Sequence, residues 1–477
     1  MNFGLGWDRV HSNHLKLSGP IFRNFLCKLY NKFLTHGHLP PQMLHGQIKP
    51  IIKNNALSKS DSSNFRPIMN SSCFLKLFEL CIAQYFSSHI RLNNRQFGFR
   101  KNTSCSAALI VLKETVKKYL GDNSNVHCAM IDISKAFDKI NYSILYNKLQ
   151  QTNLPKQITR IINFMLNNSY VNIFINNKAN DPFKVCNGTR QGGILSPIIF
   201  SFYINEIINE ISSMQVGCSL SGIRSNIVCY ADDICLLAPS PESLQLMLNN
   251  LHNGLQKVGL TVNVMKCAYI VFKNRKSLNI NSTIQLNGTY VPRVAEFKYL
   301  GTVVSENMVI SADISRVLNS FLKQYNSMYS KFYKMSFSVL KHLFKTYTNS
   351  FYGLELWYDS YCHRDIHKLE VTYHKAVKRK AHLNVWDSNH EACEILDVPI
   401  FKHLFSKRII CFYHSLINSN SPCLLPFKTY FKYNSCILKN IKTIFASKYE
   451  VNDVMANPLC AIISRINYVQ LHEPRRR

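Results

Sequence analysis

The chain has 477 residues, 46% of them hydrophobic, which is enough for two or three folded domains and too apolar for a disordered chain. Lys and Arg number 57 against 27 Asp and Glu, and the net charge of +30 indicates a polyanionic partner, either nucleic acid or an anionic membrane face. The sequence contains no uninterrupted apolar run of about 18 residues and no secretory signal pattern. We therefore expect no spanning helix and an intracellular protein that is not secreted, with nucleus or cytoplasm left open.

Apolar periodicity divides the chain into four parts. Residues 1–50 have a helical pattern that stops at Pro40 and Pro41, and residues 51–125 mix short strands with helices around 73–86 and 107–119. Residues 126–304 alternate apolar strands with helices, which predicts an α+β layer. From Ser311 onward aromatic and aliphatic residues recur at helical spacing, and this predicts an all-helical tail with its aromatic side chains in the core.

Two adjacent acids, Asp232 and Asp233, lie between apolar runs at 227–230 and 234–237. This pattern favours a tight hairpin whose tip projects two carboxylates out of a packed sheet. Neighbouring anions repel each other, and a divalent cation between them removes the repulsion. An ordinary hairpin with acidic turn residues is the alternative, and this segment alone does not decide between the two.

A second apolar strand, at 127–131, ends at Asp132. Ser134 is predicted to cap a following helix that carries Phe137 and Asp138, and Asp138 is expected to cap or pair rather than to bind metal. Three carboxylates at the ends of neighbouring strands can hold two Mg²⁺ ions, an arrangement that serves phosphoryl transfer. Asp132 therefore favours the metal-site interpretation of the acidic hairpin.

The segment 187–197 is a glycine-containing turn that leads into a helix, with Ser196 as the predicted cap and Pro197 at the first helical position. Gly192 and its neighbour allow the backbone to approach a flat ligand closely, and Gln191 can form hydrogen bonds in a groove. Taken alone, two adjacent glycines are weak evidence for a site, because they usually mark only a turn.

Taken together, these segments resemble the reverse transcriptases of non-LTR (LINE-type) retrotransposons. The resemblance covers about residues 45–302 and depends on an ordered series of motifs: IKPIIK at 48–53, NFRPI at 64–68, QFGFR at 96–100, DISKAFDKI at 132–140, TRQGGILSP at 189–197, YADDICLLA at 230–238, GLTVNVMK at 259–266 and FKYLG at 297–301. Each motif is modestly specific, and their common order makes the series much more so.

The resemblance implies a right-hand polymerase of the α+β class. Its fingers and an N-terminal helical segment would occupy 1–125, a ferredoxin-like palm 126–304, and a helical thumb with an all-helical C-terminal extension 305–477. The implied activity is that of an RNA-directed DNA polymerase, which extends a primer 3′-hydroxyl with dNTPs on an RNA template using two Mg²⁺ ions, for which Mn²⁺ can substitute. A non-catalytic nucleic-acid-binding remnant of the same fold is the alternative. No membrane partner is expected, and protein partners are left unknown.

The resemblance also implies roles for single residues. Asp132, Asp232 and Asp233 are the expected catalytic and metal-binding triad, with the carbonyl of Ile133 as a further ligand. The expected nucleotide-binding residues are Lys53, Arg66, Phe137, Gln191, Gly192 and Lys266, and the expected primer grip comprises Phe297, Lys298, Tyr299, Leu300 and Gly301. Phe137 would clash with a ribose 2′-hydroxyl, and the alternative is that it is a core phenylalanine. Lys266 would protonate pyrophosphate, and the alternative is that it is an ordinary surface lysine.

Other enzymes with a related palm are alternative interpretations of the sequence. A group II intron maturase or a telomerase-like enzyme would share the palm but should carry a maturase or RNA-binding domain, which the flanks do not clearly show. A primase or RNA-dependent RNA polymerase would need room for the 2′-hydroxyl, and Phe137 argues against it. We also expect the chain to lack an endonuclease domain and so to extend a supplied primer without nicking DNA.

Overall fold

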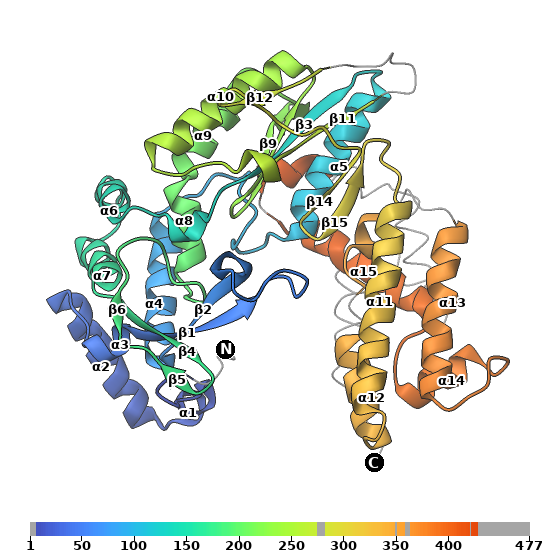
Figure 1. Ribbon diagram of the computed structural model, residues 1–477, viewed down its shortest axis with the longest axis horizontal. Coiled ribbons are helices and arrows are strands. Elements are labelled where there is room, and N and C mark those ends of the chain that lie inside the picture. The colour runs from blue at the N-terminus through green and yellow to red at the C-terminus, as the bar shows by residue number, and fades with distance from the viewer. Residues whose placement is uncertain (1–5, 274–281, 349–350, 358–362, 420, 428–477) are drawn as a thin grey trace, which may run out of the picture.

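The computed structural model describes residues 6–273, 282–348, 351–357, 363–419 and 421–427 (Figure 1). It has the α+β architecture expected from the sequence, with sheets in the N-terminal and central parts followed by a helical C-terminal part. Residues 428–477, the last part of the helical region predicted for 305–477, lie outside the described residues. Among the helices within these ranges, none is long and apolar enough to cross a membrane.

The N-terminal part contains a five-stranded sheet in the order β2-β1-β4-β5, with β6 also paired to β4. Its elements are α1 (Ser12–Leu17), α2 (Pro20–His36), α3 (Pro41–Leu44), β1 (His45–Ile52), β2 (Phe65–Ser71), α4 (Cys73–His89), β4 (Tyr170–Ile175), β5 (Lys178–Ala179) and β6 (Phe183–Lys184). The helical pattern predicted for residues 1–50 is wrong at 45–50, because β1 lies between β2 and β4 and sheet pairing overrides the local pattern. Pro41 begins α3 and does not end the helical part.

The central part contains a four-stranded antiparallel sheet in the order β11-β3-β10-β9. Its strands are β3 (Val126–Asp132), β9 (Ile227–Tyr230), β10 (Asp233–Ala238) and β11 (Ala268–Phe272), and its helices are α5 (Cys105–Gly121), α6 (Tyr142–Gln150), α7 (Lys156–Asn167), α8 (Ser196–Tyr203), α9 (Asn205–Ser213) and α10 (Pro241–Lys257). The chain passes from β3 through α8 and α9 to the β9–β10 hairpin, and then through α10 to β11. This is the ferredoxin-like arrangement expected for the palm.

The central sheet separates two apolar cores. Along β10, Cys235 and Leu237 pack into the core that contains α5, whereas Ile234 and Leu236 pack into the core that contains α8, α9 and α10. Strand side chains alternate between the two faces of a sheet, so a strand covered on both sides is apolar at every position. The carboxylates of Asp132 and Asp233 therefore lie at the end of this sheet, where the packing stops.

The C-terminal part is helical, as predicted. Its helices are α11 (Ser311–Phe332), α12 (Phe337–Tyr347), α13 (His363–Lys380), α14 (Asn389–Leu396) and α15 (Phe401–Ile417). Two two-stranded ribbons come before α11: β12 (Gln285–Leu286) with β13 (Thr289–Tyr290), and β14 (Glu296–Tyr299) with β15 (Thr302–Ser305). A third ribbon, β7 (Ser219–Leu220) with β8 (Ile223–Arg224), comes earlier in the chain, before β9. Phe321 of α11 is buried against Phe351 and Tyr373, and Tyr325 is buried against Phe344, so these aromatic residues lie in the core as predicted. Tyr329 is exposed, and for this residue the prediction is wrong. In Figure 1 these helices stand opposite the β1–β2 hairpin.

Candidate active site

Asp132 and Asp233 lie directly opposite each other on adjacent strands. Asp132 ends β3, Asp233 begins β10, and the two are register partners in the antiparallel pair. Asp232 occupies the turn between β9 and β10, next to Ala231, whose φ of 56° places it in the left-handed region. The acidic hairpin predicted from the apolar runs is therefore confirmed, and the strand ends place the three aspartates at the same edge of the sheet.

The surroundings of Asp232 and Asp233 oppose the negative charge of their carboxylates. Burial against the sheet, and then the charges of Asp232 and Asp132, raise the pKa of Asp233 to about 6. The pKa of Asp232 is also raised, first by burial and more weakly by Asp132. Without a metal, Asp232 and Asp233 therefore hold their protons more tightly than ordinary aspartates do.

Carboxylate oxygens are the donors that Mg²⁺ prefers, so the residue types fit a divalent cation. Within the part of the chain that the structure describes, no three His, Cys, Asp or Glu side chains are already gathered as a metal site. Bare carboxylates repel each other, and a cation would be needed to draw these three inward. The suitability of this site for a divalent cation is therefore argued from the carboxylate donors and from the strand register that places them at one edge of the sheet.

A cavity of about 970 Å³ opens beside Asp132 and Asp232. The predicted nucleotide-binding residues all line it, together with Ile133: Lys53, Arg66, Phe137, Gln191, Gly192 and Lys266. Asp233 is outside this lining. Its side chain reaches solvent at the end of the sheet, although the packed strands around it limit its hydration. The structure thus brings residues from seven of the eight quoted sequence motifs around one space.

Basic side chains outnumber acidic ones on the wall of this cavity. Lys53, Arg66, Lys135 and Lys266 are all exposed on it, and Lys139 is partly exposed. Lys135 and Lys139 were not among the predicted site residues, although both stand within four residues of Phe137 in the quoted DISKAFDKI motif. A cavity with carboxylates at one end and ammonium and guanidinium groups along its wall suits a ligand that carries phosphates and metal ions.

The segment after Asp132 is not the helix that Ser134 was predicted to cap. Ser134 donates its backbone amide to the Thr261 carbonyl at 2.8 Å, and Lys135 adopts a left-handed conformation with φ of 48°. Only a single 3₁₀ turn, η2 (Ala136–Asp138), follows. Phe137 lies on this turn with its ring 4.8 Å from that of Phe200, so it faces the cavity and also packs against the core.

The loop before α8 is fixed to β2. Met69 donates its backbone amide to the Gln191 carbonyl at 2.7 Å, and a side chain at Gly192 would bring a Cβ within 2.8 Å of the Met69 carbonyl oxygen. Gln191 donates its side-chain amide to Asp138 at 3.0 Å, which agrees with the prediction that Asp138 pairs. Ser196 is the first residue of α8 and not its cap, and Leu195 holds the cap position without a side-chain hydrogen bond.

Arg190, in the same loop, belongs to a buried ion pair that the sequence did not reveal. It donates to the Glu79 carboxylate at 3.3 Å, to Ser169 Oγ at 3.1 Å and to the Met165 carbonyl at 3.1 Å. The other Glu79 oxygen accepts the Ile194 amide at 2.7 Å. Burial lowers the pKa of Arg190, and Glu79 opposes that change. The pair attaches the loop to α4.

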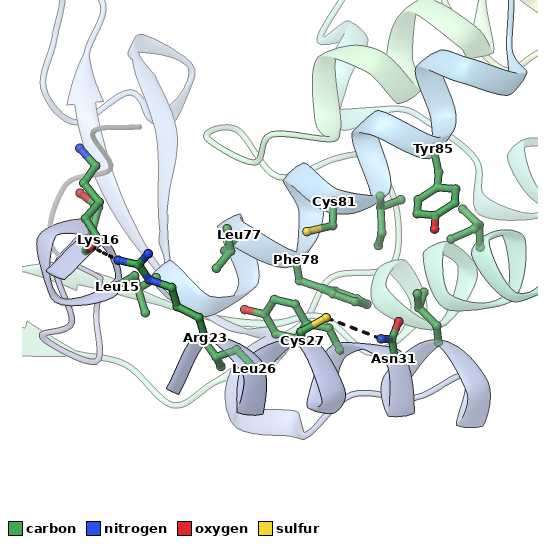
Figure 2. A pocket seen from close by; sticks show the side chains of 15 residues that line it. Leu15, Lys16, Arg23, Leu26, Cys27, Asn31, Leu77, Phe78, Cys81 and Tyr85 are labelled. Carbon is green, nitrogen blue, oxygen red and sulfur yellow. Dashed lines mark hydrogen bonds between the residues drawn. The ribbon is translucent and has the colours of Figure 1, made fainter. Parts of the chain in front are cut away.

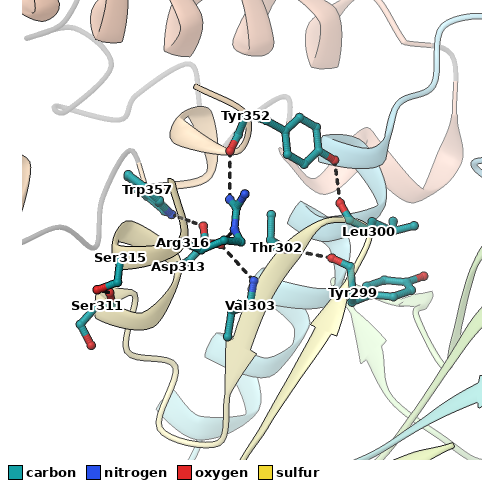
Figure 3. A network of polar contacts seen from close by, with 10 residues as sticks. All are labelled: Tyr299, Leu300, Thr302, Val303, Ser311, Asp313, Ser315, Arg316, Tyr352 and Trp357. Atoms are coloured by element: carbon teal, nitrogen blue, oxygen red, sulfur yellow. Dashed lines mark hydrogen bonds and ion pairs between the residues drawn. The ribbon is translucent and has the colours of Figure 1, made fainter. Parts of the chain in front are cut away.

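The predicted primer grip forms the β14–β15 hairpin, with Leu300 and Gly301 at its tip. Tyr299 is buried and donates its hydroxyl to the Val228 carbonyl at 3.2 Å, and Phe297 is also buried. These two rings therefore attach the hairpin to the central sheet, while Lys298 is exposed. Figure 3 shows the hairpin held on its other side, where the Tyr352 hydroxyl donates to the Leu300 carbonyl at 2.8 Å.

A second cavity, of about 410 Å³, lies between α2 and α4 (Figure 2). Its wall is largely apolar: Leu26 and Cys27 of α2 lie opposite Leu77, Phe78 and Cys81 of α4. None of the residues that line it is a predicted site residue. The carboxylate-lined cavity, and not this one, has the groups that phosphate chemistry requires.

The chain is similar to known proteins. Residues 52–304, more than half of the chain, match the family model described as reverse transcriptase (RNA-dependent DNA polymerase). The chain is 26% identical over 320 residues to the "Retrovirus-related Pol polyprotein from type-1 retrotransposable element R2" of Nasonia vitripennis, and the match covers 63% of this chain and 30% of that protein. It is 21% identical over 394 residues to the "RNA-directed DNA polymerase from mobile element jockey" of Drosophila melanogaster, covering 78% of this chain and 42% of that protein.

Among solved structures, apo telomerase from Candida tropicalis superposes with a TM-score of 0.43 at 12% identity, covering 91% of this chain and 73% of that one. The chain spans less than half the length of the two retrotransposon relatives. The extent of the family match is decisive for classification. The chain belongs to the reverse transcriptase family, among the enzymes of non-LTR retrotransposons such as R2 and jockey.

Proposed function

We propose that this chain is an RNA-directed DNA polymerase that extends a primer 3′-hydroxyl with dNTPs on an RNA template. The observation that carries the proposal is the register pair of Asp132 and Asp233, with Asp232 in the adjoining turn, at the mouth of a cavity lined with cations. Family membership implies a divalent-metal requirement and nucleic-acid binding. The non-catalytic alternative is not favoured, because all three carboxylates are present.

We assign fingers to 1–125, palm to 126–304 and thumb to the helices after 305. Asp132, Asp232 and Asp233, with the Ile133 carbonyl, would hold two Mg²⁺ ions, for which Mn²⁺ can substitute. When bound, these ions supply activation of the 3′-hydroxyl and neutralisation of the charge on the phosphates. The protein's own part is positioning and electrostatic stabilisation.

The residues that line the cavity would each contribute to positioning or to electrostatic stabilisation. Lys53 and Arg66 are exposed on the β1–β2 side and would bind the triphosphate through charge-assisted hydrogen bonds. Phe137 would exclude the 2′-hydroxyl, Gln191 and Gly192 would lie against the nucleotide and template, and Lys266 would donate a proton to pyrophosphate. The β14–β15 hairpin would position the primer end through Lys298, Leu300 and Gly301, with Phe297 and Tyr299 holding the hairpin in place.

Primer extension tests the proposal. On poly(rA)–oligo(dT) with Mg²⁺, the wild-type chain should incorporate dTTP, and Asp232→Ala should lose that incorporation. Glu210→Ala is a matched control, because this acid is exposed on α9 and does not line the cavity. Incorporation that survives Asp232→Ala would contradict the assignment, as would a wild-type protein that fails on every RNA template supplied.

A further inference from the structure

The turn that carries two of the three carboxylates has an unfavourable backbone. Ala231 has φ of 56°, a conformation in which a residue with a Cβ is strained. Its successors are Asp232 and Asp233, whose like charges add repulsion within the same turn. Such a turn needs outside support to keep one geometry.

One side chain supplies that support. Gln96 is fully buried, and its Oε1 accepts the Ala231 amide at 2.8 Å while its Nε2 donates to the Ala231 carbonyl at 3.2 Å. The same Oε1 also accepts the Gly98 amide at 2.9 Å. Both backbone polar groups of Ala231 are thus held by one amide group that is itself fixed.

The backbone around Gln96 cannot easily move away. Phe97 donates its amide to the Cys229 carbonyl at 2.8 Å, and Cys229 donates its amide to the Arg95 carbonyl at 2.8 Å, so the segment lies parallel to the end of β9. A Cβ added at Gly98 would lie 2.5 Å from the Ala231 nitrogen, which shows how closely the two segments approach. The contact joins residues 135 positions apart in the chain.

We propose that Gln96 is a positioning residue for the carboxylates: it holds Ala231 in the left-handed conformation and so fixes the directions of Asp232 and Asp233. The expected effect of Gln96 on catalysis rests on the proposed function. The expected effect of Gln96 on the conformation of the turn does not. A side-chain amide is needed because it offers an acceptor and a donor in one plane, which matches the N–H and C=O of a single residue.

The test compares Gln96→Leu, which has similar size but no hydrogen bonds, with the wild type. We expect hydrogen exchange of the Ala231 amide to become at least 10-fold faster and the Mg²⁺ concentration for half-maximal extension to rise several-fold. The kcat should fall at least 10-fold, with the KM for dNTP within about 2-fold. Adding Ala231→Gly should restore part of the kcat, because glycine adopts this φ without strain.

Asn226→Leu is the matched control. Asn226 is also fully buried, donates its side-chain amide to the Ile211 and Val216 carbonyls, and precedes β9 at the end opposite the turn. It should lower stability but leave the Mg²⁺ dependence and Ala231 exchange unchanged. Should Gln96→Leu fail to fold, Gln96→Asn, whose amide is one methylene too short, takes its place with the same expected shifts.

Wild-type Ala231 exchange and wild-type Mg²⁺ dependence in a folded Gln96 variant would overturn the inference. If the wild-type chain itself polymerises nothing, the proposed function fails independently. Ala231 exchange and Mn²⁺ affinity measured by titration, with Asp232→Asn as the metal-binding control, then decide the role of Gln96. Unchanged exchange and affinity in the Gln96 variant would refute it.

Discussion

The indole nitrogen of Trp357 donates a 3.0 Å hydrogen bond to the carboxylate of Asp313, and both residues are almost completely buried. Asp313 also accepts the Val303 amide at 3.0 Å and pairs with Arg316 at 2.5 Å, and Arg316 donates to the Tyr352 carbonyl at 3.0 Å (Figure 3). One carboxylate therefore connects the β14–β15 hairpin, α11 and the segment η4 (Leu354–Trp357).

Replacing Asp313 with alanine should lower the free energy of unfolding by about 3–5 kcal/mol, because it leaves the partners of a buried charged group unsatisfied. Urea denaturation followed by tryptophan fluorescence measures this, since Trp357 is buried in the folded chain. Glu394→Ala, an exposed acid on α14, should change stability by no more than about 0.5 kcal/mol. Equal effects of the two substitutions would contradict a structural role for the Asp313 network.

The buried ion pair of Arg190 and Glu79 makes a second prediction. Arg190→Met should destabilise the protein by about 3–5 kcal/mol, because the Glu79 carboxylate then stays buried without its countercharge. Combining it with Glu79→Gln should recover part of the loss, since the uncompensated charge is gone. A double-mutant cycle in urea measures the coupling, and strictly additive losses would show that the two side chains do not depend on each other.

Asp233 should make the stability of the metal-free protein depend on pH. Its pKa is about 6 in the folded chain against an ordinary value of 3.8, so the protonated acid favours the folded state. Its contribution is therefore complete below pH 3.8 and is lost as the pH rises through about 6. Asp233→Asn should become more stable relative to the wild type across this window. Melting temperatures at pH 4 and pH 7 in EDTA measure the change, and a constant difference between the two proteins would refute it.

Phe137 should control the choice of sugar. Phe137→Val should raise the ratio of kcat/KM for rNTP over dNTP by about 10-fold to 200-fold, the range that a change in apolar contact can supply. The Phe137 ring also contacts Phe200, so some loss of stability will accompany the change. Phe99→Val is a useful comparison, because Phe99 lines the same cavity from another segment. Single-nucleotide incorporation kinetics give the ratio, and an unchanged ratio would leave Phe137 as a core residue only.

The position of the three carboxylates at the ends of buried strands was predictable, because the local sequence pattern determines where such strands end. Apolar runs on both sides of Asp232 and Asp233 are typical of a two-sided buried hairpin, and the strand before Asp132 has the same pattern. Their exact pairing was not predictable, since strand register depends on contacts between segments about 100 residues apart.

Features that depend on distant partners were missed. Ser134 looks like a helix cap in the sequence, but its amide is taken by Thr261 and the helix never forms. Gln96 stands in a motif that was recognised, yet its contact with Ala231 is visible only in three dimensions. Tyr299 was assigned to the primer, whereas the fold buries it against β9.

The register between β3 and β10 has a consequence for how this chain can vary. A single inserted or deleted residue within either strand would send each side chain beyond it to the opposite core and would turn one aspartate away from the other. Exchange of one apolar residue for another leaves this pairing intact. Among functional relatives of this chain, the lengths of β3 and β10 should therefore vary far less than their amino-acid composition.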